Sequence, residues 1–397
     1  MLKYEKLFET FFLGGFECST HCLENGKRLD EIAFTQHDRF VKEDYQRLES
    51  VGIRSAREGI RWHLIEKSPG QYDFSSVLGM IRAARNDGIQ VIWDLCHYGW
   101  PDWLDIFEPR FITAFAQFAR EFARLLKSET AGAQFIAPIN EISFFSWGGG
   151  ESAWLNPYQR SRGDELKEQL VIAAIAATEA LWDVDKRTRI CQIDPVINVM
   201  PADPQNAQQC RDAEAYRLSQ FEAWDMLAGR VKPHLGGHEK YLDIIGVNYY
   251  VHNQWILNGT FIEPGNPRYR PFREILTEPY KRYGRPTFVA ETGIEDQARP
   301  SWFAYICNEV RAAMQSGTQV EGICIYPILN HPGWVDDRHC HNGLWDYADE
   351  KGEREIYQPL ATELKRQQQS FKEFFHFLSM NTQLPDIRLS KLLLKTI

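Results

Sequence analysis

Residues 135–141 read Phe-Ile-Ala-Pro-Ile-Asn-Glu, an apolar run followed at once by an amide and a carboxylate. A short apolar run predicts a buried strand, and polar residues directly after it mark a strand end that can carry chemistry. Similar runs recur along the chain, each followed by a longer segment of helical period. The eight runs are Phe11–Phe16, Ile53–Ala56, Val91–Trp93, Phe135–Ile139, Arg189–Ile193, Asp243–Val247, Thr287–Ala290 and Gly322–Ile325. Eight strands alternating with helices predict an α/β fold, a single (β/α)8 TIM barrel.

The segments between these runs have helical patterns. Val41, Tyr45 and Leu48 fall at i, i+4 and i+7, and a phenylalanine stripe from Phe111 to Leu125 continues over four turns. No internal repeat or low-complexity linker interrupts the series, so we expect residues 1–370 to form one catalytic domain. Residues 371–397 are predicted to form a short helical or irregular tail that packs on the barrel or on a partner.

Composition narrows the functional classes. The chain has 397 residues and a formal net charge of −9, without a dense basic cluster before its last residues, which argues against nucleic acid as a partner. No apolar stretch is long enough to span a bilayer, and the N-terminus does not resemble a signal peptide, so we expect a cytoplasmic protein without a membrane partner. Eight cysteines in so long a chain predict buried, reduced thiols.

Polar residues gather where the predicted strands end. In such barrels the active site is built at the carboxyl ends of the strands. Glu141 and Glu291 end the fourth and seventh runs, so both carboxylates can converge on one central site. Carboxylates about 5–5.5 Å apart suit a retaining glycosidase, and about 6.5–9.5 Å an inverting one. The other residues of this ring are Glu17, Arg57, Glu58, His97, Asn140, Asn248, Tyr249, Tyr250, Tyr326, Asn330 and Trp334.

Five motifs, in order, resemble those of glycoside hydrolase family 1 and its clan A relatives. Residues 52–62 resemble the Tyr-Arg-Phe-Ser-x-x-Trp segment of that family, and residues 97–101 its His-Trp-Asp-Leu-Pro. Asn140-Glu141 resembles the start of Asn-Glu-Pro, with Ile142 in place of proline. Residues 243–250 resemble Asp-Phe-Ile-Gly-Ile-Asn-Tyr-Tyr, and residues 290–293 resemble Thr-Glu-Asn-Gly. The likeness extends from the first strand to about Tyr347.

The resemblance implies roles for these residues. Glu291 would be the nucleophile, kept ionised by Arg57 and oriented by the hydroxyl of Tyr250 or, alternatively, Tyr249. Glu141 would be the general acid/base, with a pKa raised by the charge of Glu291. Sugar contacts would come from His97, Asn140, Asn248 and Tyr326, with Trp334 and Trp147 stacking on sugar C–H faces. The family's chemistry needs neither a metal nor a cofactor.

Other interpretations stay open for several residues. Arg57 can instead pair with Glu58 or Glu17, and His97 and Asn140 can satisfy backbone groups at loop starts. The tryptophans can be core residues. Residues 336–341, Asp-Asp-Arg-His-Cys-His, contain metal-ligand types but lack zinc spacing, so we interpret them as a polar loop.

Where the family has a glutamine after the first strand and a glutamate in the eighth-strand loop, this chain has Cys22 and Gly333, and Tyr326 replaces a typical tryptophan. Glu17 stands where the family has a small residue. We hypothesise that Glu17 grips sugar hydroxyls in the emptied space; the alternative is that it pairs with Arg57 or another base.

The sequence therefore predicts a retaining β-glycoside hydrolase that acts on a small glycoside whose sugar is not plain glucose. A transglycosidase would use the same residues. A sugar-binding barrel without turnover is the alternative from another class.

Overall fold

A computed structural model describes residues 6–381 of the chain. Eight parallel strands close into a barrel in the order β1-β10-β9-β7-β5-β4-β3-β2, which confirms the predicted (β/α)8 fold. The barrel strands are β1 Phe12–Gly15, β2 Ser55–Gly59, β3 Gln90–Cys96, β4 Phe135–Ile139, β5 Arg189–Pro195, β7 Ile244–Asn248, β9 Thr287–Thr292 and β10 Val320–Ile325. Two small sheets pair β6 (Asn198–Met200) with β8 (Gln254–Ile256) and β11 (His331–Pro332) with β12 (His339–Cys340).

Strand β4 has the bounds that the sequence predicts, whereas β2 and β3 run further than their apolar runs. These two strands extend beyond their apolar runs through residues whose polar side chains are buried. Arg57 in β2 hydrogen-bonds Asp94 in β3, and Glu58 in β2 accepts from His37. Because Arg57, Asp94 and Glu58 each form at least one side-chain hydrogen bond, the strands can continue through them.

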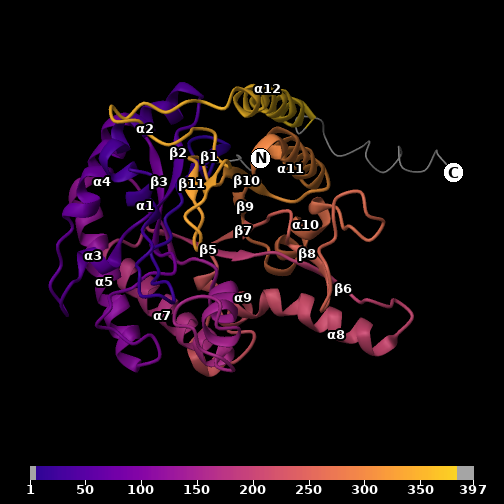
Figure 1. The fold of residues 1–397 in the computed structure, drawn as a ribbon, viewed down its shortest axis with the longest axis horizontal. Helices are drawn as coiled ribbons and strands as arrows, with labels where there is room; N and C mark the ends of the chain where they lie inside the picture. Colours follow the sequence, from indigo (N-terminus) through magenta and orange to yellow (C-terminus); the bar gives the residue numbers. More distant parts are fainter. Residues whose placement is uncertain (1–5, 382–397) are drawn as a thin grey trace.

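Helices surround the barrel (Figure 1). Both stripes seen in the sequence lie on helices. The buried members are Val41, Tyr45 and Leu48 on α2 and Phe111, Phe115, Phe118 and Phe122 on α5, whereas Leu125 is half-buried. The helices are α1 Glu31–Phe34, α2 His37–Ser50, α3 Trp62–Ile65, α4 Ser75–Asp87, α5 Pro109–Glu129, α6 Ile142–Phe145, α7 Gly163–Val184, α8 Ala207–Leu218, α9 Glu222–Leu227, α10 Phe272–Tyr283, α11 Arg299–Gln315 and α12 Gln358–Asn381.

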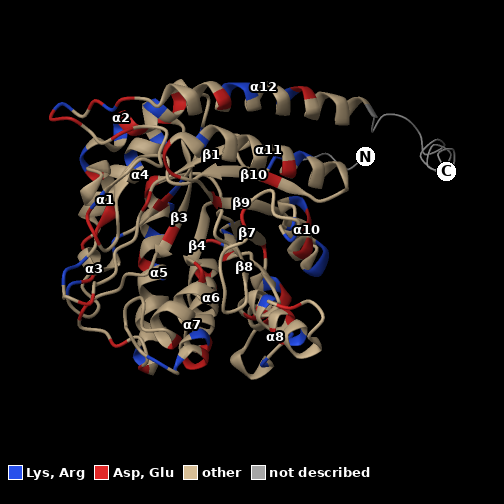
Figure 2. Ribbon diagram, turned by 45° about the vertical axis from the view of Figure 1, so that its right-hand side comes forward, with Lys and Arg blue, Asp and Glu red and all other residues tan. Residues whose placement is uncertain are grey.

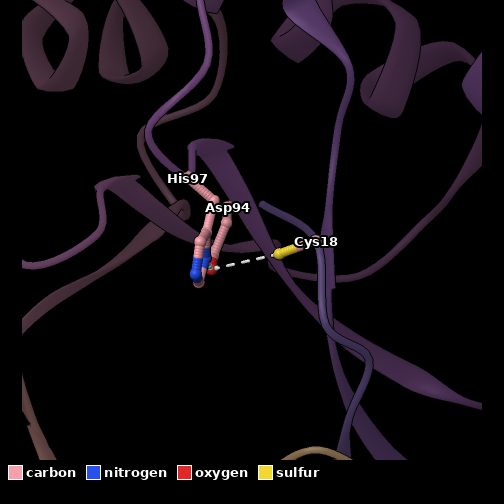
Figure 3. A group of neighbouring side chains, drawn as sticks. All are labelled: Cys18, Asp94 and His97. Atoms are coloured by element: carbon pink, nitrogen blue, oxygen red, sulfur yellow. Dashed lines mark hydrogen bonds and ion pairs between the residues drawn. The ribbon is translucent and has the colours of Figure 1, made fainter. Parts of the chain in front are cut away.

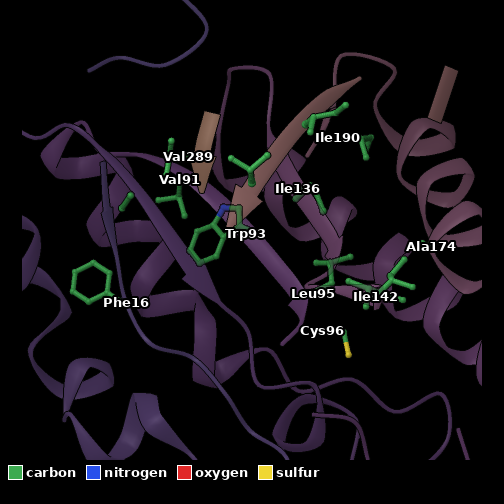
Figure 4. Packing of buried hydrophobic residues seen from close by; sticks show 14 of the residues in the cluster. Phe16, Val91, Trp93, Leu95, Cys96, Ile136, Ile142, Ala174, Ile190 and Val289 are labelled. Atoms are coloured by element: carbon green, nitrogen blue, oxygen red, sulfur yellow. The ribbon is translucent and has the colours of Figure 1, made fainter. Parts of the chain in front are cut away.

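The buried apolar residues form two clusters. The larger one fills the space between the strands and the helices, and Trp93 and Leu95 of β3 are among its members (Figure 4). Trp93 also packs against Phe122 of α5, with ring centroids 5.9 Å apart. The smaller one includes Leu13, Ala137 and other strand residues that face the barrel interior. Phe8 contacts Phe135 and Phe288, near the starts of β4 and β9, and so closes the amino end of the barrel. The carboxyl end is left to polar side chains.

Helix α12 continues past residue 370 and lies beside α11 (Figure 1). Phe371 on α12 is buried and contacts Phe11 and Phe12, with ring centroids 4.5 and 5.5 Å away. The position chosen in the sequence for the start of the tail therefore falls inside a helix that packs on the barrel. Residues 382–397 of the expected tail lie outside the described residues.

The outer helices carry acidic and basic residues interspersed along their lengths (Figure 2). Within residues 6–381, every helix is too short or too polar to cross a membrane.

Candidate active site

Glu291 lies in β9 at the carboxyl end of the barrel, with 5% of its surface exposed. Arg57 Nη1 donates to its Oε1 at 2.5 Å, and the Tyr250 hydroxyl donates to its Oε2 at 2.8 Å. Tyr249, the other candidate, instead bonds Tyr269 and Gln254. Both oxygens of Glu291 are thus held by donors, a guanidinium and a phenol, which fix the position of its carboxyl group.

Glu141 follows β4 and is 8% exposed. The Tyr98 hydroxyl donates to its Oε2, and Asn248 Nδ2 donates to its Oε1 at 2.8 Å. The pKa of Glu141 is raised to about 7, because burial and then the charge of Glu291 outweigh these hydrogen bonds. Its carboxyl is consequently poised to hold and release a proton near neutral pH.

The backbone at Glu141 and Tyr98 is left-handed, with φ of 51° and 67°. This conformation is uncommon for residues with a side chain and costs on the order of 1–3 kcal/mol, so the surrounding contacts must hold it. The two strained residues are the partners of one hydrogen bond, and the strain therefore serves to place the Glu141 carboxyl.

A continuous hydrogen-bonded path joins the two carboxyls, although β5 and β7 separate their strands in the barrel. It runs from Glu141 to the Tyr98 hydroxyl, which accepts from Asn140 Nδ2 at 3.0 Å. Asn140 Oδ1 accepts from Arg57 Nη2 at 2.6 Å, and Arg57 reaches Glu291. Such a network fixes both carboxyls relative to each other.

Arg57 is fully buried, and its ionic partners are Asp94 and Glu291, not Glu58 or Glu17. Asp94 accepts from Arg57 Nε at 3.1 Å and from Nη2 at 2.7 Å. Burial raises the pKa of Asp94, but Arg57 and His97 outweigh it and lower the value. Asp94 therefore keeps Arg57 charged and aimed at Glu291.

His97 and Asn140 bond side chains and not the backbone. His97 Nδ1 lies 3.0 Å from Asp94 Oδ2, and its Nε2 lies 3.2 Å from Asn140 Nδ2. The Tyr326 ring is stacked against His97 at a centroid distance of 6.2 Å and lies below the Arg57 guanidinium. The side chains of His97, Asn140 and Tyr326 are thus buried together around Arg57, which binds Glu291.

Cys18, Asp94 and His97 place three possible metal-ligand atoms together (Figure 3). Both oxygens of Asp94 already accept hydrogen bonds from Arg57. Burial raises the pKa of Cys18 to about 11, so its sulfur is a neutral thiol and a poor ligand. The donor set of this cluster is used within the protein and does not suit a metal.

A second such group joins His339 and His341, from the segment interpreted as a polar loop, with Asp346 beyond it. His339 and His341 stack with centroids 4.3 Å apart, and His339 Nε2 lies 3.0 Å from Asp346 Oδ1. That oxygen also accepts from Asn330 Nδ2 and from the Tyr347 backbone N–H. Asp346 Oδ1 therefore already has three polar partners within the protein.

The structure places the two tryptophans differently. Trp334 is half-buried and contacts Tyr98, the partner of Glu141, with ring centroids 5.8 Å apart. Trp147 is 43% exposed and contacts Phe144 at 5.9 Å. Trp334 is therefore linked to Glu141 through Tyr98, whereas Trp147 lies one aromatic contact further out, because Phe144 in turn contacts Tyr98.

Glu17 is buried and accepts two hydrogen bonds on Oε1, from the backbone N–H and the hydroxyl of Ser19. Burial raises the pKa of Glu17, but His97, His331 and Ser19 outweigh it and lower the value. Glu17 is therefore ionised at neutral pH and does not pair with Arg57.

Sequence reasoning missed Asp94 and Tyr98 as members of the site. A charged residue directly after the apolar Val91–Trp93 was the available signal for Asp94. Tyr98 replaces the tryptophan of the family motif, and only the left-handed backbone turns its hydroxyl to Glu141.

No model of a known protein family and no curated protein sequence matches the chain. Solved structures do match it over most of its length. The beta-glycosidase from Pyrococcus horikoshii superposes with a TM-score of 0.73 at 18% identity, over 91% of this chain and 95% of that chain. The AHE enzyme from Alicyclobacillus herbarius gives 0.74 at 16% over 93% and 100%, and a family 1 b-glucosidase from Thermotoga maritima gives 0.72 at 15% over 91% and 98%. At these identities the likeness establishes the fold.

Proposed function

We propose that this chain is a retaining β-glycoside hydrolase. The observation that carries the proposal is that two neighbouring carboxyl groups, those of Glu291 and Glu141, have different electrostatic surroundings. Glu291 forms an ion pair with Arg57 and accepts a hydrogen bond from Tyr250, whereas the pKa of Glu141 is raised to about 7. Glycoside cleavage with retention requires one ionised carboxylate as the nucleophile and one protonated carboxyl as the general acid. The fold shared with the beta-glycosidase from Pyrococcus horikoshii supports the same assignment.

In the first step a carboxylate oxygen of Glu291 bonds to the anomeric carbon while the bond from that carbon to the leaving oxygen breaks. Glu141 gives its proton to the leaving oxygen. In the second step Glu141 takes a proton from water, the water oxygen bonds to the anomeric carbon, and Glu291 is released as a carboxylate. The pKa of Glu141 falls once the charge of Glu291 is consumed and rises when it returns.

The other predicted residues position the sugar and the carboxyls. His97, Asn140 and Tyr326 form the surface beside Glu291, and Trp334 offers a ring next to Glu141 through Tyr98. We propose that the substrate is a small glycoside whose sugar differs from plain glucose, because Glu17 adds a carboxylate where Cys22 and Gly333 replace two polar groups of the resembled family.

The test is a panel of 4-nitrophenyl β-glycosides followed by ¹H NMR of the sugar released at early times. The β anomer should appear first, and Glu291→Gln should abolish release. Glu309→Gln is the matched control, because Glu309 is also a buried glutamate paired with an arginine but lies on α11. Early α anomer, or full activity of Glu291→Gln, would contradict the proposal.

A further inference from the structure

Glu31, the first residue of α1, carries a carboxyl group that is fully buried. It is 0% exposed, and neither of its oxygens has a hydrogen-bond partner among the described residues. The nearest basic atom is His331 Nδ1, 3.7 Å from Glu31 Oε2, but that nitrogen lies only 2.7 Å from the Pro332 carbonyl and donates there. Buried polar groups normally have partners, so an unpartnered carboxyl calls for a ligand that supplies donors.

Glu31 belongs to a wall of the proposed active site. Its backbone N–H donates to the Ser19 carbonyl at 3.2 Å, and Ser19 in turn holds Glu17. His21 lies in the same segment, is 2% exposed and has an unpartnered Nδ1. We call Glu17, His21 and Glu31 the carboxyl wall.

The wall adjoins the catalytic carboxyls. The His21 ring contacts Tyr98 and Trp334, with centroids 6.3 and 5.1 Å away, and Tyr98 donates to Glu141. On the other side, Glu17 lies close enough to His97 for the imidazole to lower its pKa. Through His21 and Glu17 the wall therefore borders Tyr98, Trp334 and His97, the side chains next to the two catalytic carboxyls.

The cationic side chains around the wall are engaged elsewhere. Lys27 pairs with Asp337 at 2.9 Å, Arg28 pairs with Asp102, and Arg61 pairs with Asp38 at 2.9 Å. Within residues 6–381 no ion pair involves Glu17, and the single close basic atom near Glu31 is that of His331. The chain thus surrounds two carboxyls with cations and directs each cation to another acid.

The protonation states of the wall residues also favour binding of a cation. Burial, followed by the charges of Glu17, Asp30 and Asp337, raises the pKa of Glu31 to about 9. Burial lowers the pKa of His21 to about 4 despite the opposing effect of Glu17, so its imidazole is neutral at pH 7. A cation bound here would meet the ionised Glu17 and would favour ionisation of Glu31.

We propose that the carboxyl wall binds a protonated amino group of the sugar, so that the substrates are β-glycosides of amino sugars. This inference rests on the proposed hydrolase function. An ammonium group supplies three N–H donors, which suit the free oxygens of Glu31. Glu31 releases its proton to solvent when the ammonium binds, and the ionised Glu17 supplies the second negative charge.

The experiment compares 4-nitrophenyl β-glucoside with analogues in which an amino group replaces the hydroxyl at C3, C4 or C6. At least one amino analogue should exceed the hydroxyl parent in kcat/KM by about tenfold or more at pH 7. Glu31→Gln should reduce that ratio to within about threefold. The introduced amide matches the shape of the protonated acid but cannot become anionic, and Glu309→Gln again serves as the control.

A second measurement is independent of turnover. Isothermal titration of the full chain with the free 3-, 4- or 6-amino sugars, in two buffers of different ionisation enthalpy, should show binding with proton release. Glu31→Gln should lose the proton release, and Glu17→Gln provides a second variant if Glu31→Gln fails to fold.

The outcomes separate the two claims. Hydrolysis of the panel with a preference for the hydroxyl parent at every position overturns the amino-sugar inference and leaves the hydrolase proposal standing. An amino preference that Glu31→Gln does not alter overturns the role of the wall. Binding of amino sugars with proton release, but without hydrolysis of any glycoside, supports the wall and overturns the hydrolase proposal, whereas absence of both overturns both.

Discussion

Two neighbouring regions of the barrel mouth differ in how the oxygens of their buried carboxyl groups are hydrogen-bonded. Around Glu141 and Glu291 all four carboxyl oxygens accept hydrogen bonds from side chains of the chain itself. In the carboxyl wall, Ser19 donates to one oxygen of Glu17, whereas Glu31 is more deeply buried and neither of its oxygens accepts a hydrogen bond within residues 6–381. The first region is complete without a ligand, as preorganised catalytic groups are expected to be. The second is incomplete, as a recognition surface is expected to be before its ligand arrives.

The largest effect should follow from removal of the nucleophile. Glu291→Gln keeps the volume and a hydrogen-bond acceptor for Arg57 but cannot form the glycosyl-enzyme. We expect kcat to fall by roughly 10⁴–10⁶, as for other covalent catalysts that lose their nucleophile. Steady-state kinetics on the preferred aryl glycoside measure this, and a loss below about tenfold would remove Glu291 from the chemistry.

Glu141→Gln should have the next largest effect, because general acid/base catalysis contributes typically 10²–10⁴-fold. The loss should be greatest for poor leaving groups, which need the proton most. Comparison of 2,4-dinitrophenyl with methyl glycosides checks this. Equal losses for the two leaving groups would show that Glu141 does not protonate the leaving oxygen.

Tyr98→Phe should change the pH profile more than the maximal rate. Glu141 must be protonated for the first step, so kcat/KM should fall as the pH rises through about 7. The Tyr98 hydrogen bond lowers the pKa of Glu141, so its removal should move this alkaline limb to higher pH and reduce kcat by about tenfold or less. Phe144→Leu, next to Tyr98, is the control; an unmoved limb in Tyr98→Phe would contradict the role of its hydroxyl.

The last effect concerns the stability of the fold and not the rate of catalysis, and it tests whether Glu31 is unpaired. The pKa of Glu31 is raised in the folded protein to about 9, so the stability associated with its proton is present below pH 4.5 and lost as the pH rises from 4.5 through 9. Within that window wild-type stability should fall by up to about 1.4 kcal/mol per pH unit from this group. Because the amide introduced by Glu31→Gln does not titrate, the Tm of this variant minus that of the wild type should increase from pH 5 to pH 8. A constant difference in calorimetry would mean that Glu31 is paired in solution.

Much of the fold could be predicted from local patterns. The bounds of β4 were correct because an uninterrupted apolar run ends at Asn140. Strands β2 and β3 were predicted too short, since Arg57 and Asp94 look like strand ends in the sequence. Their pairing across 37 positions makes them tolerable inside a barrel, and no local period reveals it.

Some residues of the candidate site could likewise be predicted from the sequence, and others could not. Glu141 and Glu291 stand out because each directly follows or ends an apolar run and matches a family motif. The choice of Tyr250 over Tyr249 required coordinates, because it depends on which hydroxyl reaches Glu291. Glu31 was not recognised at all: it begins a four-residue helix, and the nearest basic atom to its carboxyl belongs to His331, 300 positions later.

Mass spectrometry after incubation with 2-deoxy-2-fluoro glycosides, including amino-sugar members, tests the central claim most directly. A fluorine at C2 slows both steps, so a reactive member should leave a stable sugar ester. The account predicts an adduct of one sugar mass on the peptide that contains Glu291, and none in Glu291→Gln. An adduct on Glu141 or on any other carboxyl would contradict it.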